Sequence, residues 1–146
     1  MSAGRLGQAM GELAVETPGP GFTDVTGRLA DWLGEIGANE GLLTVFIRHT
    51  SASVTIQENA DPRVQADLVD ALSRLAPADA PYRHNTEGPD DMPAHIKAAL
   101  TSTSLAIPVR RGRMTLGTWQ GVYVIEHRAM PHRRALTLHF LGSERG

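Results

Sequence analysis

The residues best suited to chemistry are concentrated in one short stretch of the chain. Residues 84–95 read HNTEGPDDMPAH, which places two histidines and three carboxylates close together. Neutral imidazoles with carboxylates beside them are ligands that zinc and other divalent ions accept. Asp91 caps a predicted helix, so His95 lies about one turn into that helix and can face back toward His84. The stretch indicates a metal site, and the plainer alternative is a solvated acidic loop with a helix cap.

Two further histidines lie at the ends of predicted strands. His49 opens the run HTSAS (49–53) and shares a strand face with Val45 and Ile47, because side chains alternate along a strand. It therefore lies at the rim of the core, either as a functional group or as a histidine bonded to a backbone carbonyl. His127 follows Glu126 at another strand end and is a candidate fourth metal ligand.

Another polar group joins a predicted strand to a predicted helix in the run QENADP (57–62). Asp61 has a structural explanation, because an aspartate followed by proline is a typical helix start. Glu58 and Asn59 have no such explanation and are candidate site residues.

A glycine-containing segment closes the set with GTWQ at 117–120. Trp119 is either a core residue or a stacking surface, and the core is the more common place for it. The nearby arginines at 110–113 form either an exposed turn or a phosphate site, because guanidinium groups can bind phosphate through two hydrogen bonds.

The composition excludes several classes of chemistry. The 146 residues include no cysteine, which excludes disulfides and thiolate nucleophiles, and a single lysine, Lys97, which leaves no P-loop. The net charge of -2 argues against nucleic acid or a membrane surface as a partner. No apolar run approaches the ~20 residues of a membrane span, and residues 1–8 hold no signal-peptide core. We therefore expect a cytoplasmic protein with no nucleic-acid or membrane partner.

The elements that must position these groups follow from hydrophobic spacing and turn residues. A helix is predicted over 25–36 with Asp24 as N-cap, a second from Pro62 to Leu75, and a third from Asp91 to about Leu100. Strands are predicted over 8–16, 42–49, 52–57, 104–109, 122–127 and 135–141. The strands 42–49 and 52–57 are expected to pair as a hairpin across Thr50 and Ser51.

These elements indicate an α+β fold. Residues 76–90 form a long loop rich in Pro, Asp, Asn and Gly, and loops of that length in a compact domain are usually functional or disordered. Local hairpins outnumber any repeating βαβ pattern, so the sheet is expected to be mainly antiparallel. The prediction is one compact domain over residues 1–146 with about three helices.

Four blocks together resemble the YjbQ-like family, also called the secondary thiamine-phosphate synthase family. They are HTSAS at 49–53, ENADP at 58–62, HNTEGPDDMPAH at 84–95 and GTWQ at 117–120. Each block is common alone, but the ordered set is specific and spans nearly the whole chain. After the last block the chain departs from the family, because EHRAMPHRR (126–134) stands where many members have Asp-Gly-Pro-Arg. Glu126 is a candidate replacement for that aspartate, and the counterpart of the arginine stays open.

The resemblance implies a YjbQ-like α+β fold that assembles as a homotrimer. It implies a polar pocket where His49, His84 and His95 converge and hold a divalent metal ion, zinc or magnesium. It also implies a weak thiamine-phosphate synthase activity, which joins thiazole phosphate to hydroxymethylpyrimidine diphosphate and releases pyrophosphate.

A metal-assisted transferase of this kind must neutralise charge on its leaving group and hold the attacking nitrogen in line. The expected catalytic residues are Glu58, Asp91 and Gln120. The expected contacts to the phosphorylated small-molecule substrate are Asn59, Glu87, Arg113, Thr118, Trp119 and Arg134. Two alternatives stay open: a non-catalytic protein that binds a small molecule or a metal, and a metal-dependent hydrolase with a ligand position left for water.

Overall fold

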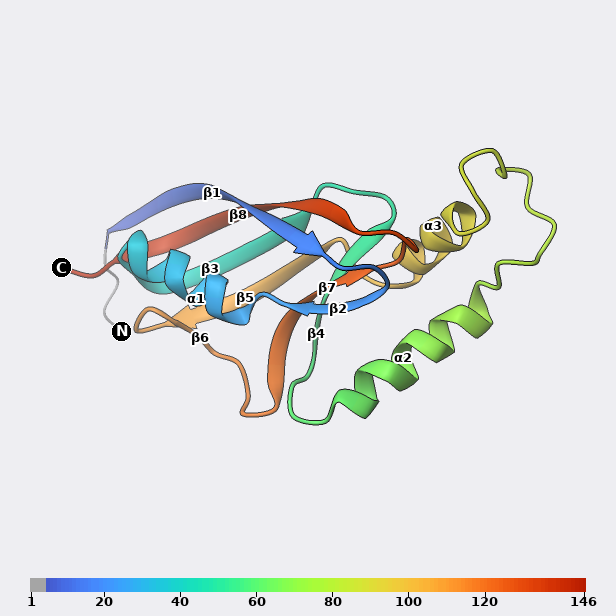
Figure 1. Ribbon diagram of the computed structural model, residues 1–146. Helices are drawn as coiled ribbons and strands as arrows, with labels where there is room; N and C mark the ends of the chain where they lie inside the picture. The colour runs from blue at the N-terminus through green and yellow to red at the C-terminus, as the bar shows by residue number, and fades with distance from the viewer. Residues whose placement is uncertain (1–4) are drawn as a thin grey trace.

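In the computed structural model, which describes residues 5–146, the chain is dominated by two antiparallel sheets (Figure 1). The larger sheet contains, in spatial order, β1 (Leu6–Thr17), β8 (His132–Glu144), β3 (Ala38–Ile47), β5 (Ser104–Arg110) and β6 (Arg113–Met114). The smaller sheet contains β2 (Gly21–Asp24), β7 (Gln120–Glu126) and β4 (Ala52–Glu58). Every ladder is antiparallel, which confirms the predicted α+β class.

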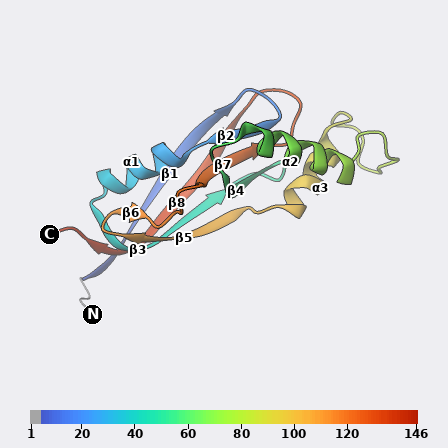
Figure 2. The ribbon, with the colours of Figure 1, turned by 90° about the horizontal axis from the view of Figure 1, so that it is seen from below.

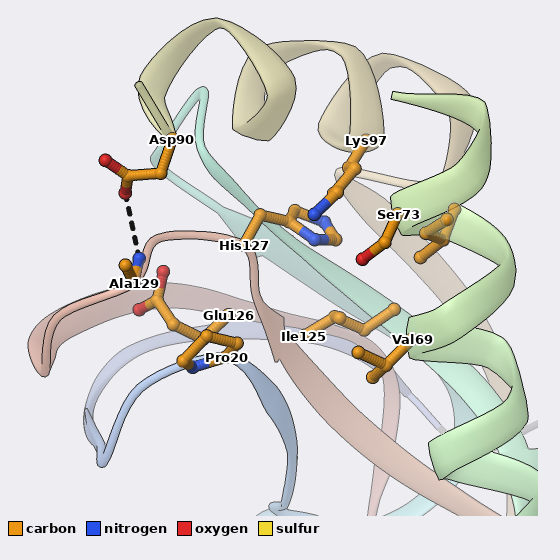
Figure 3. A pocket seen from close by; sticks show the side chains of 10 residues that line it. Pro20, Val69, Ser73, Asp90, Lys97, Ile125, Glu126, His127 and Ala129 are labelled. Carbon is orange, nitrogen blue, oxygen red and sulfur yellow. Dashed lines mark hydrogen bonds between the residues drawn. The ribbon is translucent and has the colours of Figure 1, made fainter. Parts of the chain in front are cut away.

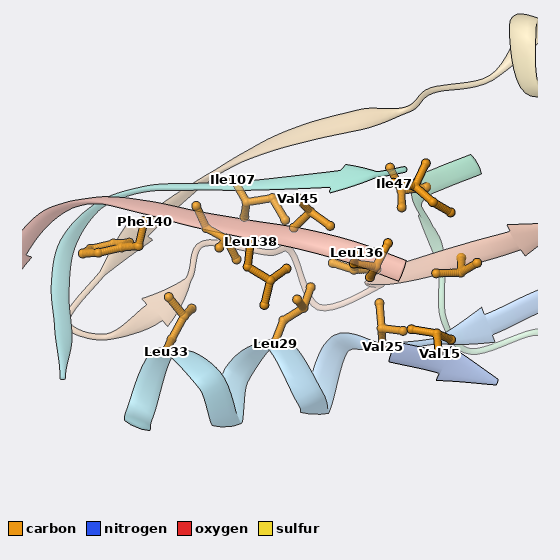
Figure 4. Packing of buried hydrophobic residues seen from close by; sticks show 14 of the residues in the cluster. Val15, Val25, Leu29, Leu33, Val45, Ile47, Ile107, Leu136, Leu138 and Phe140 are labelled. Carbon is orange, nitrogen blue, oxygen red and sulfur yellow. The ribbon is translucent and has the colours of Figure 1, made fainter. Parts of the chain in front are cut away.

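The hydrophobic core lies between the larger sheet and helix α1 (Thr26–Glu35), as Figure 4 shows. Leu29 and Leu33 are fully buried, because a spacing of four residues places both on one face of α1. They face β8, where Leu136, Leu138 and Phe140 are buried and alternate with more exposed residues. Helix α1 thus covers one face of the larger sheet and leaves the other face uncovered.

The predicted hairpin between residues 42–49 and 52–57 is wrong. β3 pairs with β8 and β5 in the larger sheet, whereas β4 pairs with β7 in the smaller sheet. Residues Thr50 and Ser51 therefore carry the chain from one sheet to the other. A short connection allows either outcome, and the strand partners that decide between them lie far away in the sequence. β2 and β6 had no sequence signal, because strands of four and two residues are too short to show a period.

The three predicted helices are confirmed, but two of the three predicted caps are not. Helix α2 (Pro62–Leu75) begins as expected, with the Asp61 carboxylate accepting the Arg63 N–H at 2.9 Å. Val25 rather than Asp24 occupies the cap position of α1, although Asp24 accepts the N–H of Thr26. At α3 (Asp91–Leu100) the cap residue is Asp90 rather than Asp91, and no side-chain cap bond forms. Both carboxylates at this helix start have other partners.

Helices α2 and α3 and the loop 76–90 form the end of the molecule that extends past the larger sheet (Figure 1). Seen from below, α2 lies alongside the strands of the smaller sheet (Figure 2). No residue of α2 is buried, whereas Pro93, Ala94 and Ala98 anchor α3. Among residues 5–146, no helix has the length and apolar character needed to cross a membrane. The anchored α3 is the element that carries the candidate site.

Candidate functional site

Three potential metal ligands meet where the loop 76–90 enters α3. His84 Nε2 lies 2.6 Å from Asp91 Oδ2, and His95 Nε2 lies 3.1 Å from the same oxygen. Asp91 and His95 are four residues apart, so they share one face of α3. The loop turns His84 back toward them at Gly88, whose φ of 98° lies in the region that glycine adopts freely. One ligand atom from each residue lies within 4.8 Å of the other two.

The backbone of the HTSAS segment orients the His95 ring. His95 Nδ1 lies 2.9 Å from the carbonyl oxygen of Thr50, which can only accept a hydrogen bond, so Nδ1 carries a proton and donates it. This leaves Nε2 as the nitrogen that faces Asp91 and His84: it donates to Asp91 when the ring is protonated, and its lone pair is available to a metal ion when the ring is neutral. Metal-binding histidines are commonly held by such a bond to their second nitrogen. Segment 49–53 therefore reaches the site through the Thr50 carbonyl.

Arg128 fixes the carboxylates from the other side. Its Nε donates to Asp90 at 2.8 Å, its Nη1 to Asp91 Oδ1 at 2.9 Å, and its Nη2 to the backbone oxygen of Glu87 at 3.2 Å. Burial alone would raise the pKa of Asp91, but the hydrogen bond from His84 and the nearby charges of His95 and Arg128 outweigh it and hold that pKa below its usual value. Asp91 is thus an ionised carboxylate at neutral pH, with one oxygen directed at both histidines.

This donor set fits a divalent metal ion. Two imidazoles and one carboxylate are the protein ligands of a well-known class of catalytic zinc sites, in which a fourth position is left for water or substrate. The His84 side chain is 45% exposed while that of Asp91 is 8% exposed, so the group is open on the His84 side. A surface hollow of ≈ 320 Å³ lies there, lined by loop residues that include Tyr82, His84 and Asn85.

His49 does not join this group. Its Nε2 accepts the backbone N–H of Ala135 at 2.8 Å, and its Nδ1 lies 3.3 Å from Arg134 Nη1. Burial and the charge of Arg134 lower the pKa of His49. The structure therefore brings together two of the three expected histidine ligands, and the third member of the group is Asp91 instead of His49.

Arg134, an expected phosphate contact, is part of a buried ion pair with Glu126. Its side chain is 4% exposed; Nε donates to Glu126 Oε1 at 2.7 Å, and Nη2 donates to Glu126 Oε2 and to the Ser51 carbonyl. Burial would raise the pKa of Glu126, but hydrogen bonds from Arg134, Thr17 and the Arg128 N–H outweigh it and lower that pKa. In this arrangement Arg134 holds the β7 and β8 ends together.

Four other expected site residues meet at the far end of β4. Glu58 Oε2 accepts the N–H groups of Ala60 and Asp61, and Asn59 Nδ2 donates to the carbonyls of Thr118 and Gln120. Gln120 Oε1 accepts the Gly117 N–H at 2.7 Å. The seven residues of β4 separate this cluster from Thr50 and the histidines by roughly 20 Å. Within one chain, Glu58 and Gln120 do not reach Asp91.

The remaining expected residues lie on the surface. Trp119 is 63% exposed, so its interpretation as a core residue is wrong. Arg113 lies in β6, in a hollow shared with Arg111 and Arg145 on a different part of the molecule from the histidines. The Glu87 side chain is exposed, and the residue meets the site through its backbone oxygen.

Two residues of the run 126–134 have roles that the motifs did not indicate. Arg128 carries the contacts to Asp90 and Asp91, and its only sequence signal is its place directly after a predicted strand. His127 bonds Ser53 through Nε2 at 2.5 Å and is absent from the group formed by His84, Asp91 and His95. The structure therefore does not place His127 as a fourth ligand.

Comparisons with known proteins agree with the sequence resemblance. The family model described as "UPF0047 protein YjbQ-like" matches residues 11–143. A UPF0047 protein of Synechocystis sp. is 48% identical over 142 residues, which cover 97% of this chain and 97% of that protein. A hypothetical protein of Aeropyrum pernix is 34% identical, with a TM-score of 0.85 over 92% of this chain and 99% of that one. A YjbQ/UPF0047 protein of Clostridium acetobutylicum is 36% identical, with a TM-score of 0.82 over 88% and 98% of the two chains.

The buried ion pair predicts how stability depends on pH. Glu126→Gln leaves the Arg134 charge buried without its partner, which we expect to lower the free energy of unfolding at neutral pH by about 3–5 kcal/mol. Because the pKa of Glu126 in the folded protein lies below its usual value of 4.5, the wild type should lose this contribution as pH falls below 4.5, and the variant should lose less there. Urea denaturation across a pH series measures both effects.

Glu12→Gln is the matched control, because Glu12 contacts Arg48 at 3.5 Å on the surface with 62% of its side chain exposed. Its effect on stability should be far smaller. Equal losses in the two variants would contradict a structural role for the Glu126–Arg134 pair.

Proposed function

This chain belongs to the UPF0047 YjbQ-like family, and from its site we propose that it is a metal-assisted transferase acting on phosphorylated small molecules. The specific reaction that we propose joins thiazole phosphate to hydroxymethylpyrimidine diphosphate, with release of pyrophosphate. The new bond forms between the thiazole nitrogen and the pyrimidine methylene carbon, and the bond from that carbon to the diphosphate oxygen breaks. Pyrophosphate leaves with the electron pair, so no oxidant or reductant is needed.

The observation that supports this proposal most is the convergence of His84, Asp91 and His95 within 4.8 Å at the mouth of a hollow. A divalent ion held there would supply positive charge beside the departing pyrophosphate. Thr50 holds the His95 ring and Arg128 holds the Asp91 carboxylate. Two of the three metal-binding side chains are therefore positioned before a metal ion or substrate binds. The hollow beside His84 offers the space in which one substrate would be oriented.

A metal-dependent hydrolase is the second candidate, and the openness of the site on the His84 side favours it. Two histidines and a carboxylate leave a ligand position for water, whose pKa a bound zinc ion lowers to about 7. The transferase and the hydrolase therefore use the same three residues and differ in which nucleophile enters the hollow.

The proposed metal site predicts which variants lose bound Zn²⁺. Purified protein loaded with Zn²⁺ and dialysed should retain up to one ion per chain by elemental analysis. His84→Ala, His95→Ala and Asp91→Asn should each lose most of that metal, since two ligands rarely retain what three hold. His49→Ala and His139→Ala should retain it, because their rings bond elsewhere. Full metal content in the His84→Ala variant would contradict this assignment.

The reaction is tested by initial rates of thiamine phosphate formation with the metal-loaded protein. Turnover should require the pyrimidine diphosphate and fail with the monophosphate, because only the diphosphate supplies pyrophosphate as the leaving group. His95→Ala should lower kcat at least as much as the loss of an outer-shell partner does, about 10–100-fold. His139→Ala should have no effect.

Equal rates in the wild type and in His95→Ala would overturn the catalytic proposal and favour a non-catalytic binding protein. Release of inorganic phosphate or pyrophosphate without thiamine phosphate would favour the hydrolase. Both outcomes come from rate assays and not from the metal analysis, so failure of the reaction would leave the metal assignment unchanged.

A homotrimer is the assembly that we propose, and the uncovered face of the larger sheet supports it. Four apolar side chains on that sheet are 40–69% exposed: Met10, Leu42, Phe46 and Leu141. Leu42 and Leu141 are cross-strand partners, so they form a continuous apolar surface. Contiguous exposed apolar area on a sheet face is typical of protein–protein contacts.

Light scattering coupled to size exclusion should therefore give about three times the mass of one chain. The double variant Leu42→Glu with Phe46→Glu should give the single-chain mass, because it places two charges in the contact. Met130→Glu, at an exposed apolar residue outside the larger sheet, is the matched control and should remain a trimer. A wild-type monomer at micromolar concentration would contradict the assembly.

A further inference from the structure

A cavity of ≈ 200 Å³ lies between α2, α3 and β7, apart from the metal ligands (Figure 3). Lys97 lines it from α3, and it follows His95 by two residues, so the two side chains leave the helix about 200° apart. Val69 and Leu72 of α2 and Ile125 of β7 form an apolar wall. The space far exceeds the ~30 Å³ share of one water and is smaller than the ~300–1,000 Å³ of drug-sized sites.

The proton positions around His127 follow from a chain of hydrogen bonds. The Thr101 hydroxyl donates its only hydrogen to the Lys97 carbonyl at 2.7 Å. The hydrogen in the Ser53–Thr101 bond must then come from Ser53, which leaves the Ser53 oxygen to accept from His127 Nε2 at 2.5 Å. His127 therefore carries its proton on Nε2. Burial lowers the pKa of His127 to about 4, so the ring is neutral at neutral pH and Nδ1 holds a lone pair.

That lone pair is directed into the cavity. His127 is 95% buried and lines the space, yet Nδ1 makes no hydrogen bond among the described residues. Within residues 5–146 no fully buried side-chain nitrogen or oxygen is left without a partner, so Nδ1 must be reached from the cavity. Buried polar groups are normally hydrogen-bonded, so an imidazole that is nine-tenths buried and has one free acceptor indicates a hydrogen-bond donor on the molecule that occupies the cavity.

Lys97 provides a positive charge beside this acceptor. It is the only lysine, and the ion pairs of the described residues are made by arginines and histidines alone. Figure 3 shows its side chain running from α3 toward the His127 ring. Two carboxylates also border the cavity, but Asp90 is paired with Arg128 and Glu126 with Arg134. The charge left unpaired in the cavity is therefore that of Lys97.

We propose that this cavity binds a small organic acid that carries a hydroxyl next to its carboxylate and a branched apolar group. The carboxylate pairs with the Lys97 ammonium, and the hydroxyl donates to His127 Nδ1. The apolar branch packs against Val69, Leu72 and Ile125. Binding here needs neither a metal ion nor the transferase reaction, so its test is independent of the proposed function.

The single lysine gives a direct probe. Protein labelled with ¹³C at the lysine Cε yields one side-chain signal, and that signal reports on Lys97 alone. The titrant is 2-hydroxy-4-methylpentanoate, with a chelator present so that the metal ligands do not contribute. We expect saturable movement of the Lys97 signal. The neutral 2-hydroxy amide should bind about tenfold more weakly or worse, since a hydrogen bond to a charged group contributes about 1.5–3 kcal/mol. The analogue without the hydroxyl should also bind more weakly, because it leaves His127 Nδ1 without a donor.

Two test variants, each with a control variant, separate the site from general effects, and binding to all four is measured by calorimetry. Lys97→Met keeps an unbranched apolar stem and should abolish binding, whereas Arg74→Met, outside the cavity lining, should not. Val69→Phe fills the cavity from a helix that has no buried residue, so the fold should tolerate it while binding is lost. Leu68→Phe is its control on the same helix.

Three outcomes of the binding tests and one outcome of the control would overturn the proposal. The first is a Lys97 signal that does not move with the hydroxy acid. The second is equal binding of the acid and its amide, and the third is unchanged binding in Val69→Phe. Thermal melting of each variant shows whether it is folded, and a loss of binding in both Val69→Phe and Leu68→Phe would also count against the cavity.

Discussion

The buried pair of Arg134 and Glu126 is the interaction on which the arrangement of this molecule depends. It joins β8 of the larger sheet to β7 of the smaller one, and Thr17 at the end of β1 bonds the same carboxylate. Glu126 also accepts the N–H of Arg128, which sets the turn that delivers the Arg128 side chain to Asp90 and Asp91. The start of α3, and with it the group of two histidines and one carboxylate, is thereby tied to the junction of the sheets.

Local signals in the sequence predicted what local chemistry decides. Asp61 before Pro62 predicted the first residue of α2, and hydrophobic spacing over 25–36 placed α1 to within about a residue. The group at 84–95 could be predicted because its members lie within one loop and one helical turn. The hairpin prediction was wrong because β3 pairs with β8 and β5, two strands that lie far along the chain. No residue near Thr50 indicates that choice of partners.

The separation of the expected site residues into two clusters has a physical consequence. His84, Asp91 and His95 lie beyond one end of β4, and Glu58, Asn59 and Gln120 lie at the other. A strand is stiff and cannot fold these ends together, so a reaction that uses both clusters requires residues from two chains. Trp119 is exposed beside the second cluster. A reaction that uses both clusters therefore depends on how the chains assemble.

Helix α3 carries residues of both the group formed by His84, Asp91 and His95 and the cavity lined by Lys97. His95 and Lys97 leave the same ten-residue helix on opposite sides, and Arg128 holds its first residue. A helix of this length moves as a rigid body, because its backbone hydrogen bonds resist bending over so few turns. The positions of Asp91, His95 and Lys97 are therefore set together by the residues that seat α3, namely Pro93, Ala94 and Ala98.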